Sequence, residues 1–180
     1  MRVIAGQARS LQLKTPKGLD TRPTQDRIKE TLFNMIRDYV EDSVFIDIFA
    51  GSGGIGIEAL SRGAAKAYFL DKSREAISCI NDNLKHTHLD ENGFVLSGDV
   101  FGTIRSIKED RADVIFIDPP YEAGYEEKLF SILSDLKFVT SDTIIILESS
   151  IEKSFEFPNF EIFKVKEYKT NKHTFFRKKD

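Results

Sequence analysis

The tetrapeptide Asp118-Pro119-Pro120-Tyr121 combines residue types that could hold a planar amine for reaction. The prolines stiffen the turn and remove two backbone donors, which leaves the Asp118 carboxylate and the Pro119 carbonyl as acceptors. An exocyclic amine of a nucleobase has two N–H donors that match them. Two such acceptors would localise the nitrogen lone pair for attack on a methyl group, and Tyr121 offers a flat face for stacking. A rigid surface turn is the alternative interpretation.

A glycine-rich segment, residues 47–56, could bind the second reactant. Residues 51–56 fit the dinucleotide pattern G-x-G-x-x-G, and Asp71 follows Gly51 at the spacing of a ribose-binding acid. An NAD-binding redox or sensor protein is therefore one hypothesis. Asp47 argues against it, because its negative charge would repel a pyrophosphate but attract the ammonium group of a ligand.

Five short apolar runs indicate strands that are buried on both faces, as in a parallel sheet. They are 44–49, 67–70, 94–96, 114–117 and 143–147, with helical stretches near 55–62, 74–85 and 126–137. This alternation predicts right-handed βαβ units in a doubly wound α/β fold. Four of the runs end in or beside an acid: Asp71, Asp99, Asp118 and Glu148. Ligands bind at the carboxyl ends of such strands, so these acids are candidate site residues.

Both ends of the chain depart from this alternation. Residues 161–168 and 173–178 flank a polar turn and predict a final antiparallel β-hairpin. Residues 3–4 and 11–13 predict a small hairpin, and 24–39 an amphipathic helix that Thr24 could cap. The apolar face expected for that helix is Ile28, Leu32, Met35, Ile36 and Tyr39.

Length and composition favour one globular domain, residues 1–180, with 1–40 as an N-terminal extension. A hydrophobic share of 41% argues against disorder. No segment approaches the roughly 20 apolar residues that span a bilayer, and the start lacks the apolar run of a signal peptide. Cys79 is the single cysteine and suits helix packing. We therefore expect a cytoplasmic protein that does not bind membranes and is a monomer.

Positive charge is concentrated at the two ends of a chain whose net charge is −3. Residues 1–37 hold eight Lys and Arg against three acids, and residues 164–180 hold seven against two. Each end therefore carries a net charge of +5, and the middle is strongly acidic. The two basic ends could form one surface that faces a polyanion such as a nucleic acid.

With these motifs, the sequence resembles the RsmD family over essentially its whole length. The segments that carry the resemblance are Arg2–Gly6, Leu19–Thr24, Asp26–Arg27, Glu30–Asn34, Asp47–Gly53 and Glu58–Gly63. The Asp-Pro-Pro-Tyr motif by itself marks only the wider group of amino-group methyltransferases. Some relatives have Phe at its fourth position, where Tyr121 preserves a stacking ring.

The resemblance implies a Rossmann-like class I methyltransferase that uses S-adenosylmethionine, without a metal, on the N2 amine of a guanine in small-subunit (16S) ribosomal RNA. Its partner would be that RNA or the assembling small subunit. The implied cofactor residues are Asp47, Gly51, Ser52 and Gly53 for the methionine half, Asp71 for the ribose, and Asp99 and Val100 for the adenine. Asp118, Pro119 and Tyr121 would hold the guanine.

Arg22, Thr24 and Arg27 match family positions beside the active site, where the resemblance implies that they help to place RNA. Arg2 and Arg9, in the basic N-terminal segment, are further expected RNA contacts. The target guanine would have to leave any stack to reach Asp118. An adenine-N6 methyltransferase acting on DNA remains an alternative, although the chain has little room for a target-recognition region.

Overall fold

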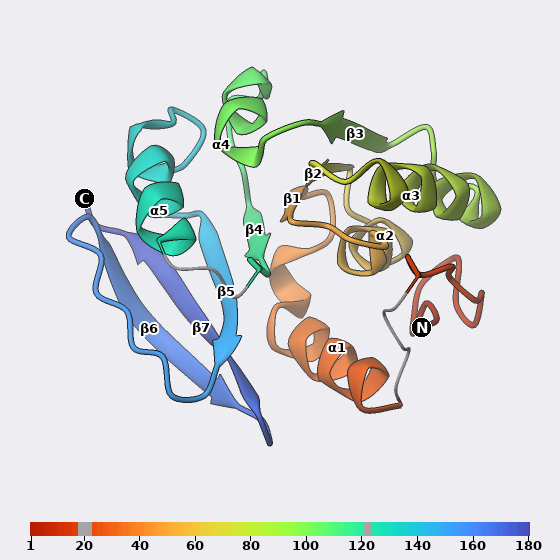
Figure 1. The fold of residues 1–180 in the computed structure, drawn as a ribbon, viewed down its shortest axis with the longest axis horizontal. Helices are drawn as coiled ribbons and strands as arrows, with labels where there is room; N and C mark the ends of the chain where they lie inside the picture. The colour runs from red at the N-terminus through yellow and green to blue at the C-terminus, as the bar shows by residue number, and fades with distance from the viewer. Residues whose placement is uncertain (18–22, 121–123) are drawn as a thin grey trace.

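The computed structural model describes residues 1–17, 23–120 and 124–180, and it is built around a seven-stranded sheet (Figure 1). The strands are β1 (Val44–Ile48), β2 (Lys66–Asp71), β3 (Gly93–Ser97), β4 (Val114–Ile117), β5 (Ile144–Ser150), β6 (Phe160–Glu167) and β7 (Asn171–Lys178). Their order is β3-β2-β1-β4-β5-β7-β6. The first five strands are parallel, and β7 runs antiparallel between β5 and β6. This arrangement confirms the predicted sheet and its final hairpin.

Helices cover both faces of the sheet, as Figure 1 shows. They are α1 (Pro23–Met35), α2 (Gly54–Ser61), α3 (Arg74–Thr87), α4 (Val100–Thr103) and α5 (Tyr125–Asp135), with 3-10 turns η1 (Arg37–Tyr39) and η2 (Ile104–Ser106). One apolar core joins α1, α2 and α3 to the sheet face that carries Phe45, and the other joins α4 and α5 to the face that carries Ile46. Successive residues of a strand point to opposite faces, so β1 contributes to both cores.

The ends of the helices follow local chemistry. Ser73 caps α3, because its side chain accepts a hydrogen bond from Ala76 N–H at 3.3 Å. The same helix ends at His88, whose left-handed backbone (φ 57°) closes its last turn. Cys79 lies buried in α3, as expected for a packing residue. The short helix α4 was not predicted, since one turn produces no periodic pattern.

The N-terminal segment differs from its prediction in two ways. The expected hairpin is one isolated bridge between Arg2 and Gln12, supported by the hydrogen bond from Val3 N–H to Leu11 O at 3.0 Å. The expected helix over 24–39 ends at Met35, and the chain continues as a 3-10 turn. Tyr39 is 43% exposed, so its assignment to the buried face is wrong: the tighter turn rotates it away from the core.

Candidate active site

The predicted acids meet at the carboxyl edge of the parallel strands. Asp71 ends β2, Asp99 follows β3, and Asp118 follows β4. The edge lies at the point where the strand order reverses, because β1 is hydrogen-bonded to β2 on one side and β4 on the other. In open α/β sheets such a switch point opens a crevice for ligands. The structure therefore brings together the residues expected for cofactor and target.

The glycine loop is tied to both neighbouring elements. Gly53 has a φ of 76° at the start of α2, a left-handed conformation that glycine adopts without strain. A Cβ added at Gly56 would lie 2.4 Å from the Phe69 ring, so glycine is required for α2 to approach β2. Gly51 N–H donates to Asp71 Oδ2 at 3.0 Å. The loop and the ribose-binding candidate thus form one rigid unit.

Asp47 lies beneath this loop and not on its open surface. Its side chain is 2% exposed, and Oδ2 accepts a hydrogen bond from Gly56 N–H at 2.9 Å. Burial, with a further contribution from the charge of Asp71, raises the pKa of Asp47 to about 7, although the hydrogen bond from Gly56 opposes the rise. Asp47 therefore orients the loop, and a cationic ligand group nearby would favour its ionised form.

The ends of β2 and β3 have the chemistry of a nucleoside site. Asp71 Oδ1 accepts from Ser73 N–H at 2.8 Å, so both of its oxygens are oriented, and each keeps a lone pair for a ribose hydroxyl. Asp99 caps α4 through a 3.3 Å bond from Phe101 N–H and stays exposed, able to accept from an amine. Val100 is buried beside it. These residues fit the adenosine half of S-adenosylmethionine, which agrees with the implied cofactor.

An aromatic cluster that sequence patterns did not reveal lies at the same edge. The Tyr125 ring is 5.7 Å from Phe49 and 5.4 Å from Phe101, centroid to centroid. Phe49 has a φ of 62°, which is uncommon for a bulky residue and stores strain where β1 turns into the glycine loop. The cluster places apolar surface between the loop, α4 and α5. Within the described residues, no group of His, Cys, Asp or Glu is arranged to hold a metal ion.

The Asp-Pro-Pro-Tyr motif begins where β4 passes beside β1. Asp118 N–H donates to Ile48 O at 3.3 Å, and Pro119 is buried. Asp118 is exposed as a residue, yet nearby protein atoms desolvate its carboxylate. This desolvation, followed by the negative charges of Glu148 and Asp47, raises the pKa of Asp118 well above the ordinary value of an aspartate. Tyr121, the predicted stacking residue, lies outside the described residues.

A hydrogen-bonded chain beside Asp118 extends across β5 and β7. Ile117 pairs with Leu147, and Glu148 with His173, which sets Asp118, Glu148 and His173 in one lateral row. Glu148 Oε2 lies 3.1 Å from His173 Nε2, and Glu148 Oε1 accepts from Asn171 Nδ2 at 2.6 Å. His173 is 1% exposed. Its Nδ1 lies 3.1 Å from the Tyr168 hydroxyl.

The direction of this chain follows from the chemistry of Tyr168. Burial and the charge of Glu148 raise the pKa of Tyr168 to about 12, so the phenol keeps its proton and can donate to His173 Nδ1. With the phenol donating to Nδ1, a neutral imidazole carries its proton on Nε2 and donates it to Glu148 Oε2. The sequence marked Glu148 as an acid at a strand end, but its partners were missed because only the pairing of β5 with β7 brings His173 to it.

The whole chain resembles proteins of one family. The family model described as Conserved hypothetical protein 95 matches residues 1–177. Ribosomal RNA small subunit methyltransferase D of Escherichia coli (strain K12) is 34% identical over 152 residues, 84% of this chain and 76% of that protein. The protein of the same name from Haemophilus influenzae is 33% identical over 155 residues, 85% and 80% of the two chains. The chain belongs to the RsmD family.

The structural comparison agrees with this membership. A solved Escherichia coli structure aligns with a TM-score of 0.86 at 32% identity, and the match covers 99% of this chain and 97% of that one. The fold is therefore the Rossmann-like class I methyltransferase fold that the resemblance implied. In the part of the chain that the structure describes, no helix combines the length and apolar character needed to cross a membrane.

The RNA contacts expected for this RsmD family member are dispersed. Arg27 is exposed on α1 at the catalytic edge, and Arg2 is exposed beside the same helix, 3.4 Å from Asp26. Arg9 is exposed in a turn whose backbone binds Ser61, at the far end of α2 from the glycine loop. Arg22 and the Thr24 side chain lie outside the described residues. Arg27 thus lies on α1 and Arg2 beside it, while Arg9 is separated from both.

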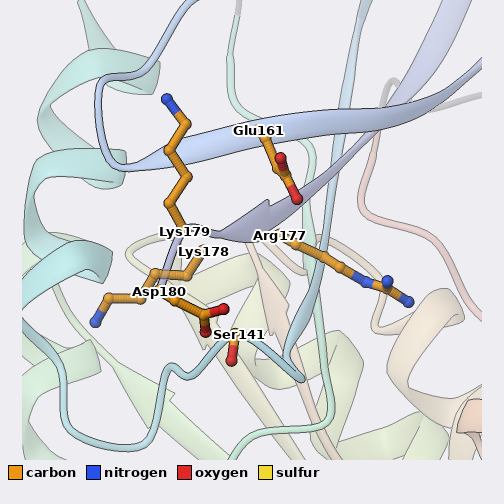
Figure 2. Close-up of a pocket in the computed structure, with 6 residues that line it drawn as sticks. All are labelled: Ser141, Glu161, Arg177, Lys178, Lys179 and Asp180. Atoms are coloured by element: carbon orange, nitrogen blue, oxygen red, sulfur yellow. The ribbon is translucent and has the colours of Figure 1, made fainter.

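The basic residues of the C-terminal segment are also divided between the two ends of strand β7. Asn171 begins β7 at the catalytic edge, beside Ser150, and Lys178 ends it at the opposite edge. The hollow around Lys178, Lys179 and Asp180 is therefore remote from Asp118, and Figure 2 shows its basic side chains pointing in different directions. The hypothesis that both basic ends form one surface is wrong for Lys178 and Lys179, because an antiparallel strand carries them away.

Proposed function

We propose that this protein transfers a methyl group from S-adenosylmethionine to the exocyclic N2 amine of a guanine in small-subunit ribosomal RNA. The observation that carries the proposal is the position of Asp118 and Pro119, across the β1–β4 switch point from the glycine loop and Asp71. Cofactor and target sites at one edge allow the amine and the methyl group to meet. The names of the RsmD relatives support ribosomal RNA as the substrate.

The chain's residues hold the amine and receive its proton. The Asp118 carboxylate and the Pro119 carbonyl accept hydrogen bonds from the two N–H groups of N2, so the lone pair of this nitrogen is directed to the cofactor. S-adenosylmethionine, when bound, supplies a methyl group on a sulfonium. The nitrogen–methyl bond forms as the sulfur–methyl bond breaks, and sulfur keeps the bonding electron pair. One N2 proton then passes to Asp118, whose raised pKa makes it the stronger base.

The guanine must be unstacked to reach this edge, so an unpaired loop or a flipped base is the expected substrate. Arg27 and Arg2 would contact phosphates beside the target. We propose that the enzyme acts as a monomer in the cytoplasm, on free ribosomal RNA or on the assembling small subunit.

The decisive experiment measures tritiated methyl transfer to small subunits, naked ribosomal RNA and DNA, with mass mapping of the product nucleotide. We expect methylguanosine in ribosomal RNA. Methylation of DNA alone would overturn the RNA assignment, and methylation at an adenine would overturn the guanine assignment.

Two variants separate amine activation from cofactor binding. Asp118→Ala should lower kcat at least about 100-fold, within the range for loss of a positioned acid–base group, while S-adenosylhomocysteine still binds. Asp71→Ala should instead weaken S-adenosylhomocysteine binding in calorimetry, because two orienting bonds and the ribose acceptor are lost. Near wild-type turnover by Asp118→Ala would contradict the mechanism.

A further inference from the structure

A cleft of about 230 Å³ opens between α1 and the turn that joins β6 to β7. Arg27, Ile28 and Thr31 line it from the helix, and Tyr168, Lys169 and Asn171 from the turn. Figure 1 shows α1 beside the strands of this final hairpin. The residues come from segments more than a hundred positions apart, so only the folded chain forms this cleft.

The lining combines apolar walls with a cationic rim. Ile28 and Tyr168 are half-buried, while Arg27 and Lys169 are exposed. Lys166 lies outside this lining but places a further cation near it, with Nζ 5.9 Å from the centroid of the Tyr168 ring. Single-stranded nucleic acid is bound by this combination, because bases pack on aromatic and apolar surface while cations neutralise the phosphates. The charge and chemistry of the cleft thus fit a nucleotide.

The cleft is joined to the catalytic edge by the hydrogen bonds of its own lining. Asn171 donates to Glu148 Oε1 at 2.6 Å, and Tyr168 reaches Glu148 Oε2 through His173. Glu148 lies on β5, directly beside β4, and Asp118 immediately follows β4. From β4 to β7 is two strand spacings, about 10 Å. A nucleotide in the cleft would therefore be a close neighbour of a base held at Asp118.

We propose that this cleft binds the nucleotide next to the target guanine and holds the RNA strand while the target base occupies the Asp118 site. The inference rests on the proposed function and adds a second RNA subsite to it. Arg27 and Lys169 would contact the phosphates on either side of that nucleotide, and its base would pack against Ile28 and Tyr168. The rigid support of Asn171 and Tyr168 keeps the subsite at a constant distance from the reacting amine.

The first test compares two identical charge reversals, Lys169→Glu at the rim and Lys179→Glu at the opposite edge. Methyl transfer to ribosomal RNA is measured over a range of salt concentrations, and S-adenosylhomocysteine binding is measured separately. Lys169→Glu should raise the KM for RNA and lower the slope of log KM against log salt by about 0.7, the effect of one single-strand phosphate contact. Lys179→Glu should match the wild type, and cofactor affinity should be unchanged in both.

The second test removes the neighbouring base instead of a side chain. RNA substrates carry an abasic nucleotide immediately 5′ or 3′ of the target. One of the two should raise the wild-type KM at least about fivefold, the lower limit for loss of one packed base. In Ile28→Ala the same abasic nucleotide should raise the KM much less than in the wild type, because the packing surface is already reduced.

The outcomes distinguish this inference from the proposed function. If the wild type methylates no RNA, the proposed function fails. If the wild type methylates ribosomal RNA but Lys169→Glu equals Lys179→Glu, or both abasic substrates react like the intact one, the cleft is not a nucleotide subsite.

Discussion

Three aspartates within one small site have different surroundings and therefore different chemistry. Asp47 is enclosed and binds the backbone of α2, Asp71 orients the glycine loop, and Asp118 keeps access to solvent while its pKa is raised. In the proposed function, the same carboxyl group would thus serve as a loop support, a hydrogen-bond acceptor for hydroxyls and a proton acceptor. Their protonation states lead to two predictions.

Asp47→Asn should stabilise the protein most at alkaline pH. The folded pKa of about 7 exceeds the ordinary aspartate pKa of 3.8, so folding favours the protonated acid, and the stability that this acid contributes is lost as pH rises through 7. A difference of about three units sets an upper limit of about 4 kcal/mol at pH 8, and the effect should vanish near pH 4. Urea unfolding at both pH values measures it, with the exposed Asp90→Asn as control. Equal effects at both pH values would contradict the prediction.

Glu148→Gln should move the acid limb of the pH–rate profile to lower pH. Asp118 must be ionised to accept from the amine, and the charge of Glu148 is one cause that raises its pKa. Loss of that charge lowers the pKa of Asp118, so activity should persist into more acidic solution. The control is Glu152→Gln, an exposed acid just beyond β5. An unmoved acid limb in a folded Glu148→Gln protein would show that the two carboxyl groups do not interact.

At the scale of elements, one buried carboxylate connects the N-terminal segment to two helices. Glu58 on α2 is fully buried, and it accepts from the backbone N–H groups of Ile4 at 2.8 Å and Ala5 at 3.0 Å. It also pairs with Lys29 on α1 at 3.3 Å and Arg62 at 2.7 Å. Glu58 thereby holds the N-terminal segment and α1 against α2, which covers the sheet.

Glu58→Gln should therefore destabilise the protein by about 3–5 kcal/mol, the usual cost of removing one partner from a buried ion pair. Burial already lowers the pKa of Lys29, and loss of Glu58 would lower it further. Urea unfolding measures the change, and the exposed Glu91→Gln should cost less than about 0.5 kcal/mol. A loss below about 1 kcal/mol for Glu58→Gln would mean that water replaces these contacts.

Over the whole molecule, the carboxyl ends of the parallel strands and the opposite ends carry different groups. The carboxyl edge carries the acids, the glycine loop and the cleft beside α1, while the opposite edge carries the basic end of β7. In Figure 1 the two termini also lie at opposite sides of the molecule. Ligand binding at the carboxyl edge involves loops that follow β1, β2, β3 and β4, so it should stabilise the fold as a unit.

S-adenosylhomocysteine at 100 times its Kd should stabilise the protein by about 2.7 kcal/mol, which corresponds to a rise in Tm of about 5–10 °C for a chain of this size. NAD at the same concentration should produce no comparable rise. Thermal unfolding distinguishes the two ligands directly. A rise with NAD and none with S-adenosylhomocysteine would favour the dinucleotide interpretation of Gly51, Gly53 and Gly56.

The sequence alone determined the parallel strands, the final hairpin and the acids at the strand ends. Continuous apolar runs such as 114–117 occur where a strand is covered on both faces, so their pattern is local and direct. The motifs at Gly51–Gly53 and Asp118–Tyr121 likewise depend on neighbours in sequence. The structure confirms the strands and the hairpin, and the family membership rests on the whole chain.

Only the tertiary structure decided what lies beside each acid. The partnership of Glu148 with His173 depends on the register of β5 and β7, and the cleft at Lys169 depends on the approach of α1. The burial that raises the pKa of Asp47 depends on the closure of α2 over it. Each of these is a contact through space between distant segments, which composition and periodicity do not contain. The candidate site residues could therefore be named from the sequence, while their protonation and their neighbours could not.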